Sequence, residues 1–196
     1  MSNPIVNNVL GVAYNSGRFQ KYAQETLKAK QGKCEDAANE VIWHAASKMT
    51  AQGAVAGIPG GLVAVGTTGV DISSVLYHTV EMCGVLAELY DFDTTKEEVR
   101  TLVLAAVTGD GTLINSALKI VNLAQNPKVK EQIIKELIKK QIVPILKQLG
   151  IKVGGRSGIK LMQLVPVVGA AVGAGTNFYT INTIGHEFLN YLKTSK

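Results

Sequence analysis

Two pairs of ionisable side chains have the spacing of metal ligands. Glu40 and His44 lie four residues apart on one helix face, and His78 and Glu81 lie three apart further along the chain. Two such helices facing each other would present two carboxylates and two imidazoles, as di-iron bundles do. Those bundles use Glu-x-x-His twice, whereas this chain has the reverse order, His78-x-x-Glu81, once. Satisfied or solvent-facing side chains are therefore the favoured interpretation, and a metal-dependent enzyme is the distant one.

A catalytic serine with a histidine base has no stronger support than a metal site. Ser73, Ser74 and the three histidines would supply a nucleophile and a base, but no Gly-x-Ser-x-Gly turn precedes the serines. We therefore predict a protein without enzymatic activity and without a cofactor.

The positive charge of the chain is concentrated in residues 125–160. The whole chain of 196 residues carries a net charge of +5, and this segment alone has nine basic residues against two acidic ones. The basic residues are Lys128, Lys130, Lys135, Lys139, Lys140, Lys147, Lys152, Arg156 and Lys160. A basic surface of this kind binds anionic phospholipid, an acidic protein or nucleic acid. Nucleic acid is the least favoured, because the segment has no aromatic residue to stack on bases and no recognition motif.

The same segment has the periodicity of an amphipathic helix over residues 129–149, in which Pro144 should introduce a kink. Interfacial membrane helices share this pattern with solvated helices that pack on a core. On the membrane interpretation, lipid headgroups or other anions would contact Lys135, Lys139, Lys140, Lys147, Arg156 and Lys160.

Two glycine-rich apolar stretches, residues 51–70 and 161–175, flank the middle of the chain, residues 71–160. Pro59 and the pair Gly60-Gly61 interrupt the first stretch, which predicts a helix, a turn and a second helix. The second is about 15 residues long, too short for a clean span of about 20, and suits a buried hairpin or an interfacial segment. Core helices are the favoured interpretation, followed by reversible membrane insertion and then a stable span. An apolar ligand or a membrane would contact Ile58, Leu62, Val65, Leu161, Leu164, Val168 and Val172.

The rest of the chain predicts helices. Residues 33–49 are rich in helix formers, Asp71 has the type of an N-cap for a helix over 72–90, and a capping box at Thr94 or Thr95 opens a helix over 97–107. The predicted fold is an all-α single-domain multi-helix bundle with two buried glycine-rich apolar hairpins. Residues 1–32 would form an N-terminal helical segment and residues 33–193 the main helical domain.

The two cysteines and the N-terminal residues favour a location in the cytoplasm. Cys34 and Cys83 are the only cysteines, which favours reduced thiols in the cytoplasm over a disulfide framework. The first 20 residues lack the charge and the apolar core of a secretory signal.

Several motifs in order along the chain resemble the EcsC protein family. They are Gly57-Ile58-Pro59-Gly60-Gly61, then Asp71, then Leu89-Tyr90-Asp91-Phe92-Asp93, then Glu98-Val99-Arg100, and finally the glycines of residues 160–177. The resemblance covers about residues 35–186, and Asp91 stands where the family usually has glycine. It implies structural roles for Gly57, Pro59, Gly60, Gly61, Asp71, Asp93, Arg100, Gly169 and Gly173. It also implies a bacterial or phage origin and a link to membrane processes, but no defined reaction.

From charge and resemblance together we predict a peripheral, lipid-interacting accessory protein at the cytoplasmic side of the inner membrane. Its partner would be anionic lipid or a membrane protein complex, and its basic helix would dock there. The alternative is a soluble helical module that binds an acidic protein. The sequence leaves the oligomeric state open.

Overall fold

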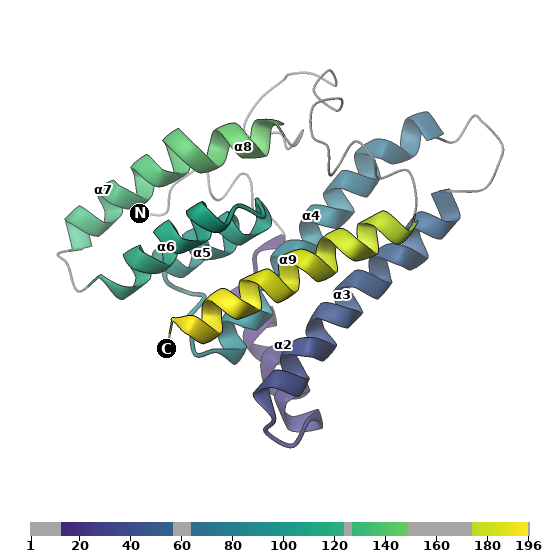
Figure 1. Ribbon diagram of the computed structural model, residues 1–196, viewed down its shortest axis with the longest axis horizontal. Coiled ribbons are helices and arrows are strands. Elements are labelled where there is room, and N and C mark those ends of the chain that lie inside the picture. The colour runs from purple at the N-terminus through teal and green to yellow at the C-terminus, as the bar shows by residue number, and fades with distance from the viewer. Residues whose placement is uncertain (1–12, 57–63, 124–126, 149–173, 196) are drawn as a thin grey trace.

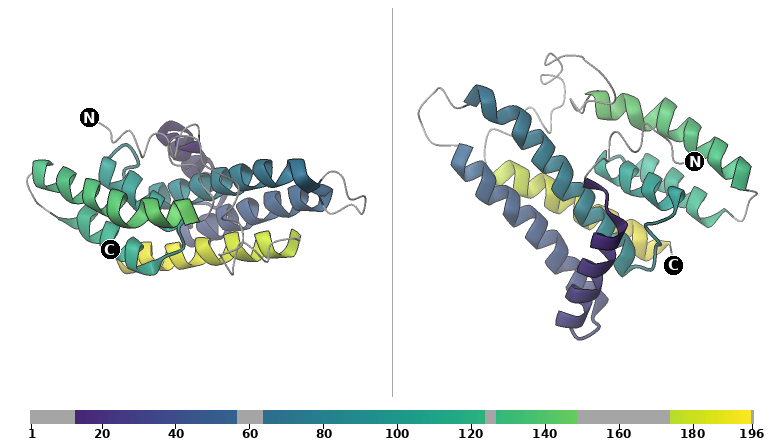
Figure 2. Two further views of the ribbon diagram at one scale, coloured as in Figure 1. Left: turned by 90° about the horizontal axis from the view of Figure 1, so that it is seen from above. Right: turned by 180° about the vertical axis from the view of Figure 1, so that it is seen from behind.

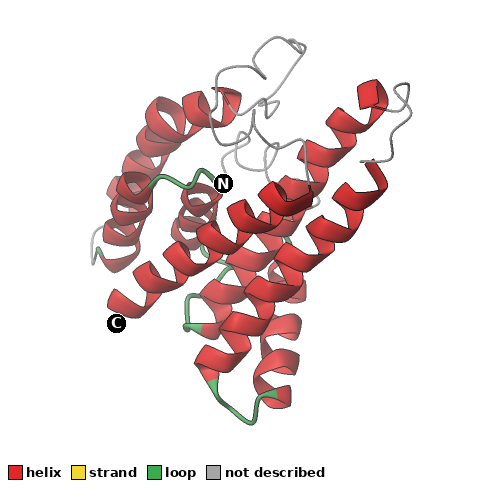
Figure 3. Cartoon of the chain, turned by 45° about the vertical axis from the view of Figure 1, so that its right-hand side comes forward, coloured by secondary structure: helices red, strands yellow, loops and turns green. Residues whose placement is uncertain are grey.

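The computed structural model describes residues 13–56, 64–123, 127–148 and 174–195, with side chains over 13–48, 76–123, 127–145 and 178–195. Every regular element in this part of the chain is a helix (Figure 3), so the all-α single-domain prediction is confirmed. The helices are α2 (Ser16–Ala29), α3 (Cys34–Ala56), α4 (Ala64–Leu89), α5 (Glu97–Val107), α6 (Gly111–Asn122), α7 (Pro127–Leu137), the π-helical turn η2 (Ile138–Ile142), α8 (Val143–Gln148) and α9 (Ala174–Thr194). Among the described helices, none is long and apolar enough to cross a membrane.

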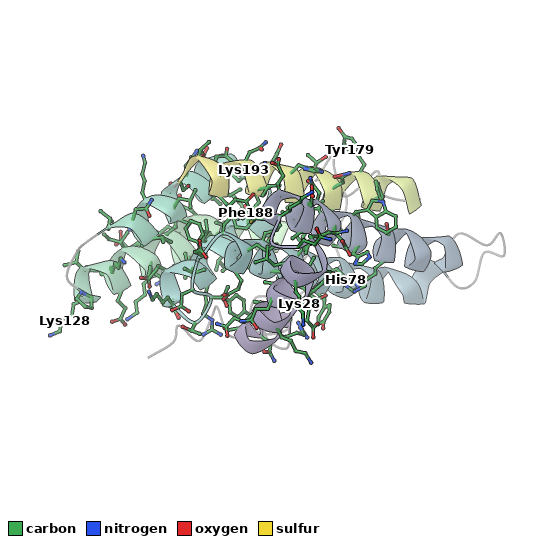
Figure 4. All side chains as sticks on the ribbon, turned by 90° about the horizontal axis from the view of Figure 1, so that it is seen from below. Lys28, His78, Lys128, Tyr179, Phe188 and Lys193 are labelled. Atoms are coloured by element: carbon green, nitrogen blue, oxygen red, sulfur yellow. The ribbon has the colours of Figure 1, made fainter. Side chains whose placement is uncertain are left out.

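Three layers build one half of the molecule. The long helices α3 and α4 run antiparallel as the middle layer, α9 packs along them on one side, and α2 crosses them on the other (Figures 1 and 2). Lys28 of α2 and Tyr179 of α9 accordingly point to opposite sides of the molecule (Figure 4). Gly185 permits the close approach of α9, because a Cβ there would lie 2.9 Å from side-chain atoms of Ile42 and Met82.

The other half is built on α5 and α6, which form an antiparallel pair beside α4. Gly109 ends the α5 segment with a φ of 67°, and the Asp110 carboxylate accepts hydrogen bonds from the N–H groups of Thr112 and Leu113 to open α6. The continuous rod of α7, η2 and α8 lies over α5 and α6 (Figure 1).

Two predicted helix starts need correction. Asp71 is not an N-cap, because α4 begins at Ala64 and Asp71 lies in its interior. Helix propensity is a weak constraint, and α4 continues through Gly66 and Gly69 despite their cost.

The predicted capping box is also wrong, although α5 spans residues 97–107 as expected. Its N-cap is Lys96, without a side-chain capping bond. Thr94 and Thr95 have other acceptors: Thr94 donates its N–H and hydroxyl to Glu88, and Thr95 donates both of its own to Asp93. The threonine side chains thus donate to nearby carboxylates and do not cap the start of α5.

Candidate site: the basic outer face of α7 and α8

Four lysines lie exposed along the rod of α7 and η2, on the side away from α5 and α6. We call this surface the basic outer face, and its described members are Lys128, Lys135, Lys139 and Lys140. Lys128 extends from the outer end of α7 (Figure 4). The buried side of the same rod consists of Ile134, Leu137, Ile138, Ile142 and Val143. The amphipathic pattern predicted from the sequence is therefore present, and its apolar side packs on the protein itself.

An ion pair fixes the rod in this orientation. The Nζ atom of Lys130 lies 2.9 Å from Oε1 of Glu98 on α5 and 3.4 Å from the carbonyl oxygen of Val121 on α6. Both side chains are less than one-fifth exposed. Burial is the largest single influence on Glu98 and raises its pKa, but the hydrogen bond and charge of Lys130, a backbone hydrogen bond and the charge of Lys96 together hold the pKa of that carboxyl below its ordinary value. Lys130 thus positions the rod, while the other lysines face solvent.

Two of the outward lysines have carboxylate partners one turn earlier. Lys135 lies 2.6 Å from Glu131, and Lys140 lies 3.2 Å from Glu136. All four side chains are about half exposed or more, so solvent screens each pair and its contribution to stability is small. An external phosphate can therefore displace either glutamate at little cost.

The rod contains a π-helical turn in place of the kink expected at Pro144. Proline has no N–H, and its ring would collide with the carbonyl four residues earlier in an α-helix. Across η2 the Val143 N–H donates to the carbonyl of Ile138, five residues back, which widens the turn just before the proline. Ile138 and Ile142 remain fully buried, while Lys139, Lys140 and Gln141 between them are exposed.

The remaining predicted contact residues have no described side chains. Lys147 belongs to α8 and Val65 to α4. Outside the described residues lie Arg156, Lys160, Ile58, Leu62, Leu161, Leu164, Val168 and Val172, together with Gly57, Pro59, Gly60, Gly61, Gly169 and Gly173. The predicted turn at Pro59 likewise lies outside the described residues.

The four residues considered as metal ligands lie on α3 and α4, and three of them contact α2 or the residue that follows it. Over the described side chains, no cluster of three or more potential ligands is present. Glu40 pairs with Lys30, and His44 Nδ1 lies 3.3 Å from the Tyr22 hydroxyl. Glu81 lies 3.1 Å from Arg18 Nε. Glu40, His44 and Glu81 thus contact α2 or the residue that follows it, and His78 lies beside Glu81.

His78 and Arg18 both lie close to the Glu81 carboxyl. His78 Nδ1 lies 3.8 Å from Glu81, beyond hydrogen-bond distance, and the Arg18 guanidinium lies 4.9 Å from the centre of the Tyr77 ring. His78 and Arg18 hold the pKa of the Glu81 carboxyl below its ordinary value, against burial, which raises it.

Sequence reasoning missed the α2 side of these contacts and one exposed aromatic. Arg18, Tyr22 and Lys30 escaped notice because their partners lie far away in the sequence. Trp43, the only tryptophan, is 59% exposed beside an open depression. That depression is lined by Lys30, Asp36, Asn39, Glu40, Trp43 and His44. Its acidic groups already pair with neighbouring lysines, so it presents no net charge to a ligand.

Asp93 and Arg100, two of the motif residues, each make local contacts. Asp93 accepts from Thr95 and lies 3.8 Å from Lys96. Arg100 lies 4.0 Å from Glu97, and its guanidinium covers the Tyr14 ring at 4.8 Å from the ring centre. Since Tyr14 donates to the Thr94 carbonyl, these motif residues join the start of the described chain to the α4–α5 turn.

The fold and the site define an all-α domain with a basic amphipathic rod. The model of the EcsC protein family matches residues 4–188, nearly the whole chain, and the protein belongs to that family. No curated protein and no solved structure matches it.

Proposed function

We propose that the protein is a non-enzymatic, peripheral membrane or lipid-interacting accessory protein whose basic outer face docks on anionic lipid. Its place would be the cytoplasmic side of the inner membrane. The observation that carries the proposal is the exposure of Lys128, Lys135, Lys139 and Lys140 along one side of a single rod. Each lysine near an anionic leaflet contributes about 1 kcal/mol of attraction.

The packing of the rod limits how it would bind. An interfacial helix normally buries its apolar side among the acyl chains. Here Ile134, Leu137, Ile138 and Ile142 are occupied by contacts within the domain. Docking through the basic outer face would therefore be electrostatic and sensitive to salt.

The arrangement of helix ends supports a contribution from the glycine-rich stretches. The end of α3, the start of α4 and the start of α9 lie together at one end of the molecule (Figure 1). The segments that connect α3 to α4 and α8 to α9 therefore begin or end near one another. We propose that both stretches add apolar contact with lipid at that end.

Charge reversal tests the docking face. Replacing Lys135, Lys139 and Lys140 by glutamate should abolish flotation with anionic vesicles at low salt. The matched control reverses Lys21, Lys28 and Lys33, which are also exposed but belong to α2 and the turn after it. It changes the net charge equally and should leave most of the binding intact.

The results of these flotation experiments distinguish a lipid partner from a protein partner. Equal loss of binding in both triple variants would show that net charge matters and the face does not. Unchanged binding after reversal of the outer face would contradict the proposal. No flotation by the unaltered protein would favour the alternative, an acidic protein bound to the same lysines.

A further inference from the structure

The π-helical turn leaves a backbone acceptor among the lysines of the outer face. In a helix, the Lys139 carbonyl would receive the N–H of Val143 in α geometry or of residue 144 in π geometry. Val143 donates to Ile138, and Pro144 has no N–H to donate. Neither helical donor is therefore available to the Lys139 carbonyl.

This carbonyl belongs to the solvent side of the rod. Lys139, Lys140 and Pro144 are all exposed, whereas the neighbouring Ile142 and Val143 are buried. Among the described residues, Lys139 has no carboxylate within ion-pair distance, and Lys140 has only the exposed Glu136. One turn thus presents two ammonium donors and one carbonyl acceptor that lacks its α- and π-helical donors.

We propose that η2 is a headgroup site for anionic phospholipids whose headgroup carries hydroxyl groups, such as phosphatidylglycerol. The lipid phosphate would accept hydrogen bonds from Lys139 and Lys140, and a headgroup hydroxyl would donate to the Lys139 carbonyl. The inference rests on the proposed membrane function and adds the class of lipid.

The same geometry disfavours headgroups whose donor is charged. The serine headgroup offers the Lys139 carbonyl only an ammonium donor, which two lysine ammonium groups would repel, and its carboxylate would pair with those lysines without using the carbonyl. A hydroxyl makes the same hydrogen bond without that repulsion. One hydrogen bond of ordinary net strength predicts a preference of roughly two- to tenfold for phosphatidylglycerol over phosphatidylserine.

Pro144→Ala is the informative variant, because it changes no charge. Alanine restores the missing N–H and removes the ring, so the rod can return to α geometry and satisfy its own carbonyls. Affinities of the full chain for vesicles containing phosphatidylglycerol or phosphatidylserine at equal mole fraction should then become equal. Pro127→Ala is the matched control, since Pro127 opens α7 where a proline costs nothing.

The result expected is a preference for phosphatidylglycerol in the unaltered protein and in Pro127→Ala, and its loss in Pro144→Ala. Equal, salt-sensitive binding to both lipids by the unaltered protein would overturn the headgroup site and leave the membrane function standing. Absence of binding to either lipid would overturn both. A preference that survives Pro144→Ala would also contradict the site.

Free glycerophosphoglycerol distinguishes the headgroup from the bilayer. Titrating it into isotope-labelled protein should shift the amide signals of residues 139–143 and of Ile145 most strongly and leave those of α2 unchanged. Shifts spread over every exposed lysine would indicate general charge screening and contradict the site.

Discussion

At the scale of single residues, Asp91 shows what the family's usual glycine does. The Phe92 N–H donates to the Ala87 carbonyl at 2.9 Å, and the Asp91 N–H donates to the Glu88 carbonyl at 3.1 Å. These bonds form a Schellman motif at the end of α4, in which the left-handed residue is usually glycine. Asp91 occupies that position with a φ of 60°.

Asp91→Gly should therefore stabilise the protein by about 0.5–1 kcal/mol, because glycine adopts positive φ without steric cost. Urea denaturation monitored by circular dichroism measures the change. Asp91→Ala is the control, since it removes the carboxylate but keeps the Cβ, and it should give no gain. An equal gain from both variants would assign the effect to the charge instead of the backbone.

The carboxyls under α2 predict a dependence of stability on pH. The pKa of Glu81 is lowered by His78 and Arg18, and the pKa of Glu40 is lowered by its hydrogen bond with Lys30. A carboxyl with a lowered folded-state pKa contributes stability above its unfolded value, 4.5 here, and loses that contribution as the pH falls through the folded value.

Glu81→Gln should accordingly cost about 1 kcal/mol at neutral pH and almost nothing well below pH 4.5. Urea unfolding of both proteins across this range measures the difference. Glu25→Gln, on the exposed side of α2, should be neutral throughout. A constant difference between Glu81→Gln and the unaltered protein at every pH would show that its ionisation is not involved.

At the scale of elements, the rod of α7, η2 and α8 is held by its apolar side and by one half-buried ion pair. Lys130 and Lys135 are close in sequence, yet only Lys130 contacts another helix. Lys130→Ala would leave the Glu98 carboxylate without its cation in a half-buried position.

Lys130→Ala should therefore cost about 1–3 kcal/mol. Lys135→Ala should change stability by about 0.5 kcal/mol or less. Thermal unfolding ranks the two variants, and hydrogen exchange should show faster exchange across α7 in Lys130→Ala. Equal effects of both substitutions would contradict the positioning role of Lys130.

Elements with strong local signals were predictable from sequence, and those set by distant contacts were not. The periodicity of residues 129–149 identified both the buried isoleucines and the exposed lysines. Pro144 was recognised as a disruption, but the π turn that precedes it was not predicted, because Ile138 and Ile142 share one face in an α-helix as well. The contacts of α2 were missed because Arg18 and Glu81 meet only in the folded chain.

At the scale of the whole molecule, charge and apolar sequence are placed on different elements. The basic outer face belongs to a rod whose apolar side is already used by the domain. The end of α3, the start of α4 and the start of α9 lie at one end of the molecule (Figure 1). The account therefore predicts two contributions to membrane binding, one that salt weakens and one that salt does not.

Flotation of the purified protein with neutral and anionic vesicles tests the central claim most directly. It is measured at low salt and at about 0.15 M salt, because exposed charges more than about 8 Å apart are largely screened at the higher concentration. The account predicts binding that requires anionic lipid and weakens as salt is added, with any residual binding assigned to the glycine-rich stretches. Equal binding to neutral vesicles would contradict docking through the lysines, and absence of binding under every condition would contradict a membrane function altogether.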